Sequence, residues 1–234
     1  MSIQFKTAAD AVQETGLKAV IYGSAGVGKT VFCTTSGDRT MLLSAEAGLL
    51  SIRNTKADVA IHEVRSLDDV GAAYEYLKND TEFKTVCIDS ISEVAEVCLA
   101  EELKKSASGD PRKAYGELIQ RMTNLIRAFR DLPGRDVVMT AKVERILDDS
   151  NRLLYSPAMP GAKLGAALPY LFDLVCPLRV EKDREGALQR WLQTGTDGSY
   201  VAKDRSGLLE MFTEPDLAAI KAQITGVTST KKAA

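Results

Sequence analysis

Gly23-Ser24-Ala25-Gly26-Val27-Gly28-Lys29-Thr30 matches the phosphate-binding loop pattern G-x-x-x-x-G-K-[ST] without a gap. An apolar run over residues 17–22 leads into this loop, and Val31-Phe32-Cys33 follows it in a register that suits a helix. The pattern carries meaning only in a strand–loop–helix context, and these flanks supply it. The alternative is a glycine-rich turn that matches by accident. The flanking segments favour a genuine phosphate site over that alternative.

Each residue type in the loop has a chemical role. Glycines let successive backbone N–H groups turn inward as an anion-binding nest, and the following helix adds its positive N-terminal end. The Lys29 ammonium can reach the β- and γ-phosphates, which makes Lys29 a catalytic candidate, and the Thr30 hydroxyl can ligate Mg²⁺. The predicted nucleotide-binding residues run without a break through Gly23, Ser24, Ala25, Gly26, Val27, Gly28, Lys29, Thr30 and Val31.

The composition is that of an ordinary globular protein with little net charge. A formal charge of -2 over 234 residues offers no strong field to nucleic acid or to anionic lipid, so nucleic-acid binding would need a local basic patch. No run approaches the ~18 apolar residues of a membrane span, and the first residues lack a signal pattern. We therefore expect a cytoplasmic protein without membrane contacts. The cysteines lie in apolar stretches without a C-x-x-C pair, which predicts buried, reduced thiols: Cys33, Cys87, Cys98 and Cys176.

The periodicity of apolar residues alternates between strand and helix along the chain. It predicts strands at 40–44, 59–64, 83–90 and 136–141, and helices near 66–77, 91–103 and 118–129, the first of them capped by Ser66 with Asp69. The polar stretch 104–113 is predicted to be a loop and 146–154 a hairpin. The pattern ends with strands at 174–180 and 188–194 and a last helix that begins near 214–216. Pro177 is expected at an edge or a bulge. This order predicts one α/β domain with a mostly parallel twisted sheet, helices on both faces and late antiparallel strands at one edge.

Two acidic residues follow strands that we expect beside the loop. Asp89 comes after Thr85-Val86-Cys87-Ile88, the apolar strand plus aspartate of a Walker B element, and it could hold a water on Mg²⁺. The alternative is that Asp89 caps the helix that begins at Ile91. Glu46 follows the strand over 40–44, where a glutamate can orient and deprotonate an attacking water. An isolated glutamate would otherwise be a surface residue.

The segment Ser44-Ala45-Glu46-Ala47-Gly48-Leu49 resembles the aspartate-alanine-glutamate segment of RecA-type recombinase cores, with Ser44 in place of the aspartate. The resemblance implies that Glu46 is the catalytic base, because the glutamate has that role in the family. The pair Asp89-Ser90 is similar to the family's Walker B aspartate-serine. A polar residue that ends the strand after the next helix senses the γ-phosphate in such proteins. Here that residue would be Thr140 or Lys142, and the sequence leaves the choice open.

More narrowly, the chain resembles the short phage-encoded RecA-like ATPases of single-strand annealing and recombination. The loop, the Glu46 segment, the strand over 137–141 and Pro169-Tyr170-Leu171-Phe172-Asp173 carry this likeness, which spans roughly residues 17–180. It implies a RecA-like core over 17–226, a disordered tail at 227–234 and an N-terminal segment at 1–16, with a host-cell cytoplasmic location if phage-encoded. In that segment Phe5-Lys6-Thr7-Ala8 resembles the Phe-x-x-Ala tether of recombinases. The alternative is that Phe5 packs beneath the first strand.

In RecA-like proteins two loops hold single-stranded DNA. The resemblance places these loops at 104–113 and between 142 and 163, where basic residues could contact phosphates: Lys104, Lys105, Arg112, Lys113, Arg145, Arg152 and Lys163. Tyr115 and Tyr155 are the nearest aromatic residues for base stacking. The alternative is that both are ordinary solvated loops. A basic residue from a neighbouring subunit often completes such a site, and the donors considered are Lys163, Arg179 and Lys182.

These observations favour a Mg²⁺-dependent, ATP-binding and ATP-hydrolysing RecA-like protein that binds single-stranded DNA. The expected partners are single-stranded DNA, further copies of the chain in a ring or filament, and a single-strand-binding protein. One alternative is a P-loop kinase of a small metabolite, although such enzymes usually carry an arginine-rich lid and this chain has no tight arginine cluster. Another is a nucleotide-dependent switch that docks replication proteins.

Overall fold

The computed structural model describes residues 5, 7, 15–46, 48–105, 111–148, 150–183 and 185–226. The predicted tail at 227–234 lies outside these residues, as does most of the N-terminal segment that contains the predicted tether. Phe5 is described and is 91% exposed. It therefore does not pack beneath the first strand, as the alternative to the tether required.

The order of elements follows the sequence pattern closely. The strands are β1 (Lys18–Tyr22), β2 (Thr40–Ser44), β3 (Val59–Glu63), β4 (Thr85–Asp89), β5 (Asp136–Ala141), β6 (Val143–Leu147), β7 (Leu153–Pro157), β8 (Leu174–Lys182), β9 (Leu188–Gln193), β10 (Lys203–Asp204) and β11 (Phe212–Thr213). The helices are α2 (Lys29–Phe32), α3 (Leu67–Asn79), α4 (Ile91–Lys105), α5 (Pro111–Arg130), α6 (Ala162–Ala167) and α7 (Leu217–Thr225), with 3₁₀ turns η1 (Leu49–Ile52) and η2 (Leu168–Leu171).

The described strands other than β6 and β7 form a nine-stranded sheet with the order β11-β9-β8-β1-β5-β4-β2-β3, and β10 pairs with β8. The strands from β3 to β8 in this order run parallel. Strands β9 and β10 pair antiparallel with β8, and β11 pairs antiparallel with β9. The predicted α/β class, the parallel centre and the antiparallel edge are confirmed. The central strands are buried along their whole length because helices cover both faces.

The expectation for Pro177 was wrong, because Pro177 lies in β8, which has neighbours on both sides. Pro177 pairs with Tyr22 of β1 at the end of that ladder. On the other side of β8, the pairing with β10 ends at Val175 and the pairing with β9 begins at Leu178. Pro177 falls between these two ladders, so its missing N–H leaves no ladder bond unmade.

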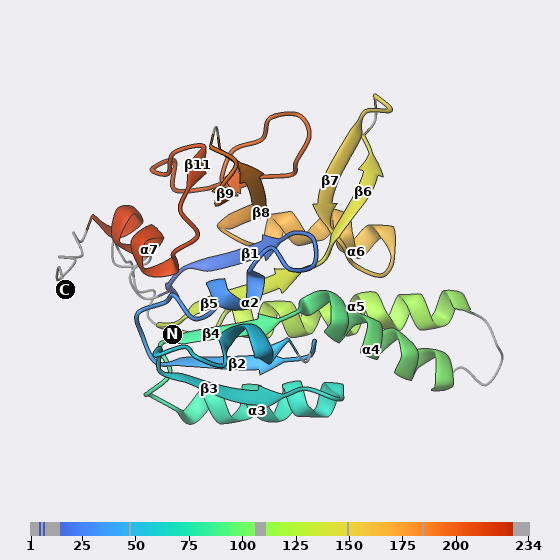
Figure 1. Ribbon diagram of the computed structural model, residues 1–234. Helices are drawn as coiled ribbons and strands as arrows, with labels where there is room; N and C mark the ends of the chain where they lie inside the picture. The colour runs from blue at the N-terminus through green and yellow to red at the C-terminus, as the bar shows by residue number, and fades with distance from the viewer. Residues whose placement is uncertain are drawn as a thin grey trace.

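Two hydrophobic clusters fill the two faces of the sheet. The larger one packs α3, α4, α5 and α6 on one face, with fully buried side chains such as Leu118, Met122 and Phe172. The smaller one packs α2, η1 and α7 on the other face around Phe32, Leu192 and Leu217. Figure 1 shows these two helical layers with the sheet between them. Both faces of the sheet are thereby covered and removed from water. This burial of apolar surface is the main driving force for the architecture.

Two pairs of elements project from the body of the molecule (Figure 1). The β6–β7 hairpin was predicted and is confirmed, and it forms a separate two-stranded sheet. Helices α4 and α5 form the other projection and pack against each other. The prediction of one continuous loop over 104–113 was wrong, because Lys104 and Lys105 end α4 while Arg112 and Lys113 begin α5. Residues 106–110 lie outside the described part of the chain.

Other local predictions are borne out by the structure. Ser66 caps α3 in a capping box with Asp69, and Asp216 caps α7. The four cysteines are free and buried. Among the described helices, none has the length and apolar character needed to cross a membrane.

Candidate active site

The predicted site residues meet at the carboxyl edge of the parallel strands. Ser44 of β2 pairs with Asp89 of β4, and Thr140 of β5 pairs with Ile21 of β1, directly before the loop. Because parallel strands end on the same edge of a sheet, this register brings Glu46, Asp89, Thr140 and the loop to one place. The sequence placed these residues up to about 120 positions apart along the chain.

Glycines shape the loop at two kinds of position. Gly26 and Gly28 have φ angles of 77° and 110°, a region that other residues rarely adopt. A Cβ atom on Gly23 would lie 2.7 Å from the backbone oxygen of Leu178 in β8. The predicted helix after the loop is present as α2, although it has only four residues. Phosphate binding therefore depends on the N–H groups of the loop, and the helix dipole adds little.

Lys29 is buried within the loop that it serves. Its Nζ donates hydrogen bonds to the backbone oxygens of Gly23 and Ser24, both at 3.0 Å. Burial lowers the pKa of Lys29 from its usual value, and the nearby carboxylates of Glu46 and Asp89 oppose that shift. The ammonium thus lies among loop carbonyls and acidic groups, which is where a triphosphate would compete for it.

Asp89 links the end of β4 to α2 and β5 through its carboxylate. Its Oδ2 accepts a 2.6 Å hydrogen bond from Thr30 Oγ1, and its Oδ1 accepts one from Thr140 Oγ1. Two hard oxygen donors this close together suit Mg²⁺, which usually takes one or two protein ligands besides phosphates and waters. The alternative role as a helix cap is not what the structure shows, because the N–H of Glu93 in α4 donates to Ser90 Oγ. No group of three or more His, Cys, Asp or Glu side chains that could hold a metal ion is found among the described residues, at this site or elsewhere.

Glu46 lies against the Asp89–Ser90 segment. Its Oε1 accepts a hydrogen bond from Ser90 Oγ, and the N–H groups of Ala45 and Glu46 donate to the backbone oxygen of Asp89 at 2.7 Å and 3.3 Å. These contacts fix the start of the segment after β2 on the end of β4. The carboxylate is thereby held beside Lys29 and Asp89, where it can accept a proton from a water.

The two sensor candidates have different surroundings. Thr140 is fully buried and its hydroxyl is engaged with Asp89, so it positions that carboxylate. Lys142 is partly exposed and forms ion pairs with Glu93 at 2.7 Å and Glu96 at 3.0 Å. Its charge is close enough to contribute to lowering the pKa of Lys29. Lys142 is therefore the more exposed of the two candidates, and its cation is already paired with two carboxylates.

Two features of the site were missed from the sequence. Arg190 of β9 donates from Nε to the backbone oxygen of Val27 at 3.1 Å. Tyr22, at the end of β1, donates from its hydroxyl to the backbone oxygens of Tyr155 at 3.1 Å and Val201 at 2.8 Å. No local pattern predicts these contacts, since each joins residues more than 130 positions apart.

An aromatic stack lies beside the first half of the loop. The rings of Tyr155 and Tyr200 stack with centroids 4.8 Å apart and an angle of 18°. The Arg145 guanidinium lies 5.6 Å from the Tyr155 ring centroid, and that of Arg179 lies 4.8 Å from the Tyr200 centroid. A cavity of about 270 Å³ separates these rings from Gly23 and other loop residues. The stack joins the β6–β7 hairpin to the segment around Tyr200, and the cavity lies between the stack and the phosphate loop.

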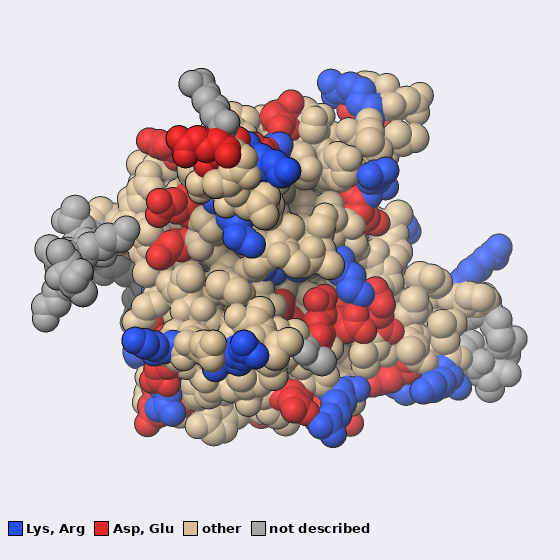
Figure 2. All heavy atoms as spheres, viewed as in Figure 1, with Lys and Arg blue, Asp and Glu red and all other residues tan. Residues whose placement is uncertain are grey.

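The predicted DNA-binding residues are spread over the two projections and α6. Lys104, Arg112 and Lys113 are exposed near the α4–α5 tip, while Lys105 is paired with Glu102 at 2.9 Å. Figure 2 shows basic side chains at the outer ends of the hairpin and of the α4–α5 pair.

Two of the remaining DNA candidates differ in their charge partners. Arg152 at the hairpin tip is paired with Asp148 at 2.7 Å, whereas Lys163 of α6 is exposed. Among the suggested donors to a neighbouring subunit, Arg179 is paired with Glu181 and Asp197, while Lys182 is exposed.

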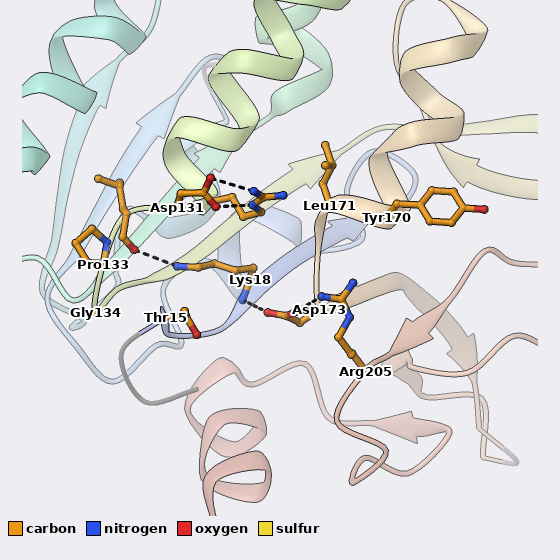
Figure 3. Close-up of a pocket in the computed structure, with 11 residues that line it drawn as sticks. Thr15, Lys18, Asp131, Pro133, Gly134, Tyr170, Leu171, Asp173 and Arg205 are labelled. Carbon is orange, nitrogen blue, oxygen red and sulfur yellow. Dashed lines mark hydrogen bonds and ion pairs between the residues drawn. The ribbon is translucent and has the colours of Figure 1, made fainter. Parts of the chain in front are cut away.

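A cavity larger than the one beside the loop lies away from this site. It measures about 790 Å³ and lies at the amino ends of β1 and β8, the opposite edge of the sheet from the loop (Figure 3). Four of its charged side chains form ion pairs, Arg130 with Asp131 and Arg205 with Asp173, and the Lys18 ammonium donates to backbone oxygens. The volume of a cavity therefore does not identify the active site here. The polar groups that converge at the loop identify it.

The fold and the loop geometry define a P-loop nucleotide-binding domain. The AAA domain family matches residues 15–206, which is most of the chain, and the chain belongs to this family. No curated protein matches it. Membership of this family indicates nucleotide binding and hydrolysis at the loop.

Proposed function

We propose that the protein is a Mg²⁺-dependent ATPase of the RecA-like type that binds single-stranded DNA in recombination or strand annealing. The observation that carries the ATPase part is the convergence of Lys29, Thr30, Asp89 and Glu46 at one edge of the sheet. A phosphate loop alone holds a nucleotide. The additional carboxylate at Glu46 supplies a group that can activate water.

The roles of the side chains follow from their positions. Loop N–H groups and Lys29 would bind the β- and γ-phosphates, and Thr30 with Asp89 would hold Mg²⁺. The ion, when bound, would neutralise charge on the phosphate oxygens. Glu46 would accept the proton of the water whose oxygen attacks the γ-phosphorus, and the leaving β-phosphate oxygen keeps the electron pair of the broken bond. Thr140 keeps Asp89 in position throughout.

The DNA-binding part of the proposal is supported by the two projections. Cationic side chains lie at their outer ends although the chain as a whole has a net charge of -2. In the hairpin, Arg145 lies over Tyr155, so that a cation able to contact phosphate lies beside an aromatic ring. Single-strand binding proteins combine these two chemistries. The proposed partners are single-stranded DNA, further copies of this chain and a single-strand-binding protein.

The test is ATP hydrolysis with Mg²⁺, measured with and without a long single-stranded oligonucleotide. We expect Glu46→Gln to lower the turnover number by about 10²- to 10⁴-fold while nucleotide binding is retained, because only the proton acceptor is lost. Glu210→Gln, at an exposed glutamate away from the loop, serves as the matched control and should keep the wild-type rate. Oligonucleotide should raise the wild-type rate. A rate that survives Glu46→Gln and ignores the oligonucleotide would sink the proposal and favour a kinase or a switch.

A further inference from the structure

We infer that Arg190 binds the nucleoside end of the nucleotide, at its α-phosphate and the adjoining sugar and base, from within the same chain. The inference rests on the nucleotide-binding part of the proposed function and adds a residue to it. It concerns a position outside the loop, in the antiparallel edge of the sheet.

The first step is the contact itself. Arg190 Nε is 3.1 Å from the backbone oxygen of Val27, and a Cβ atom on Gly28 would lie 3.5 Å from the same nitrogen. The guanidinium therefore lies against the part of the loop that leads into α2. Only Nε is engaged, so the two terminal nitrogens of the guanidinium retain their N–H donors for another group.

The second step concerns charge. Arg190 is exposed, and within the described part of the chain it forms no ion pair with an acidic side chain. Arg179 of the neighbouring strand β8, whose cross-strand partner is Trp191, is paired with Glu181 and Asp197 and is thus already neutralised. A cation held against a phosphate loop without its own counterion is suited to bind an anionic ligand there.

The strand order supplies the third step, because it fixes the direction of the nucleotide. Asp89 ends β4 and Glu46 follows β2, and both strands lie on one side of β1. Strands β8 and β9 lie on the other side of β1. The γ-phosphate must be near Glu46 and Asp89 for hydrolysis. The nucleoside end must then extend away from them, and Arg190 of β9 lies on that side of the loop.

This geometry distinguishes two roles for an arginine. An arginine that stabilises the γ-phosphate acts on turnover and distinguishes a triphosphate from a diphosphate. An arginine at the nucleoside end contacts groups that ATP and ADP share, so it contributes equally to both and leaves turnover unchanged. The position of Arg190 predicts the second behaviour.

The experiment measures the affinities of ADP and of a non-hydrolysable ATP analogue by calorimetry with Mg²⁺, and turnover at saturating ATP. We expect Arg190→Ala to weaken both ligands by about tenfold, the loss typical of a charge-assisted hydrogen bond, with turnover within about twofold of wild type. Arg65→Ala, at an exposed arginine beyond the far edge of the sheet, is the matched control and should bind like wild type.

Two further variants separate charge from bracing of the loop. Arg190→Lys keeps the charge and should recover much of the affinity, whereas Arg190→Gln keeps a donor for the Val27 oxygen and should bind as weakly as Arg190→Ala. If Arg190→Gln binds like wild type, the residue only braces the loop and the inference is overturned. Loss of the ATP analogue alone, with reduced turnover, would overturn it in favour of a γ-phosphate role. A wild-type protein that binds neither ligand would overturn the proposed function as well.

Discussion

Thr85 and Thr140 lie near opposite ends of the neighbouring strands β4 and β5, and their hydroxyls have different surroundings. Thr140 Oγ1 donates to Asp89, whereas Thr85 Oγ1 is the one buried side-chain polar atom in the described chain that has no hydrogen-bond partner. An unpaired buried hydroxyl costs free energy, and a paired one that positions a carboxylate contributes to the site. Replacement of the hydroxyl by a methyl group should therefore impair the site at Thr140 and stabilise the protein at Thr85.

At Thr140 we predict an effect on metal use. Thr140→Val removes one of the two hydrogen bonds that orient the Asp89 carboxylate, so the Mg²⁺ concentration for half-maximal hydrolysis should rise by about tenfold. Titration of the ATPase rate with Mg²⁺ measures it, and Thr140→Ser should restore the wild-type value. An unchanged Mg²⁺ requirement in Thr140→Val would show that Asp89 does not depend on this bond.

At Thr85 the prediction concerns stability. Thr85→Val replaces the unpaired hydroxyl by a methyl group of nearly the same shape, and the free energy of unfolding should increase by about 1 kcal/mol. Chemical denaturation with urea measures the change. Hydrolysis should remain at the wild-type rate, since Thr85 begins β4 at the edge of the sheet away from the loop.

The β6–β7 hairpin is the element for which the structure adds most to the sequence. Arg145 and Tyr155 are paired across its two strands, and Tyr155 stacks on Tyr200 outside the hairpin. The hydroxyl of Tyr22, the last residue before the loop, binds the Tyr155 backbone. The hairpin base is thus tied to the residue that immediately precedes the loop, so that a strand bound on the hairpin has a physical route to the nucleotide.

We predict that Arg145→Ala weakens binding of single-stranded DNA. One phosphate contact should be lost, so the slope of log affinity against log salt concentration should decrease by about 0.7. Fluorescence anisotropy with a labelled oligonucleotide at several salt concentrations measures this slope. Arg65→Ala is the control and should keep it. If Arg145→Ala leaves both affinity and slope unchanged, the hairpin does not contact the phosphates.

The sequence predicted the elements well where the signal was local. Strand β4 and its aspartate, the capping box of α3 and the glycine loop are each read from a few adjacent residues. The predicted loop took in the last residues of α4 and the first of α5 because polarity and the Gly109-Asp110-Pro111 run suggested a break, whereas α4 packs on α5 and continues to Lys105, and α5 begins at Pro111.

The residues of the candidate site were also predictable from the sequence only where the signal was local. Lys29, Thr30 and Asp89 follow from motifs, and Glu46 needed a family resemblance to be distinguished from a surface glutamate. Arg190 and the Tyr155–Tyr200 stack could not be found from the sequence. Their roles depend on the register of β8 with β9 and on the path of the segment around Tyr200, which are set by long-range packing.

For the whole molecule, the cavity opposite the loop contains a titrating lysine. Lys18 is 5% exposed and its Nζ donates to the backbone oxygens of Arg135 and Leu132. Burial lowers its pKa to about 8, against the attraction of Asp136 and Asp173. Between pH 8 and its unperturbed value of 10.5 the unfolded chain keeps a proton that the folded chain has released. Lys18 therefore contributes a rise in the free energy of unfolding with pH in this window.

The predicted rise is at most about 3 kcal/mol over the full window. It is isolated by urea denaturation of wild type and Lys18→Met from pH 8 to about pH 9.5, because the raised pKa values of Cys33, Cys98 and Cys176 act in the opposite direction above about pH 9, and that of Tyr22 does so above pH 10. The free energy of unfolding of wild type minus that of Lys18→Met should rise with pH, whatever the substitution does to stability at pH 7. The pKa of Lys29 is also lowered, so Lys29 changes the free energy of unfolding in the same direction. The comparison of wild type with Lys18→Met isolates the contribution of Lys18. Equal slopes would contradict the prediction.

The contacts of Lys29 have a consequence for the heat of nucleotide binding. Before any ligand arrives, its ammonium already donates to the carbonyls of Gly23 and Ser24. A triphosphate must exchange these bonds for its own oxygens, so the enthalpy released is a difference between two sets of partners. The heat released on nucleotide binding should be smaller than a count of phosphate contacts suggests. A correspondingly larger part of the binding free energy should come from the entropy of released water and counterions.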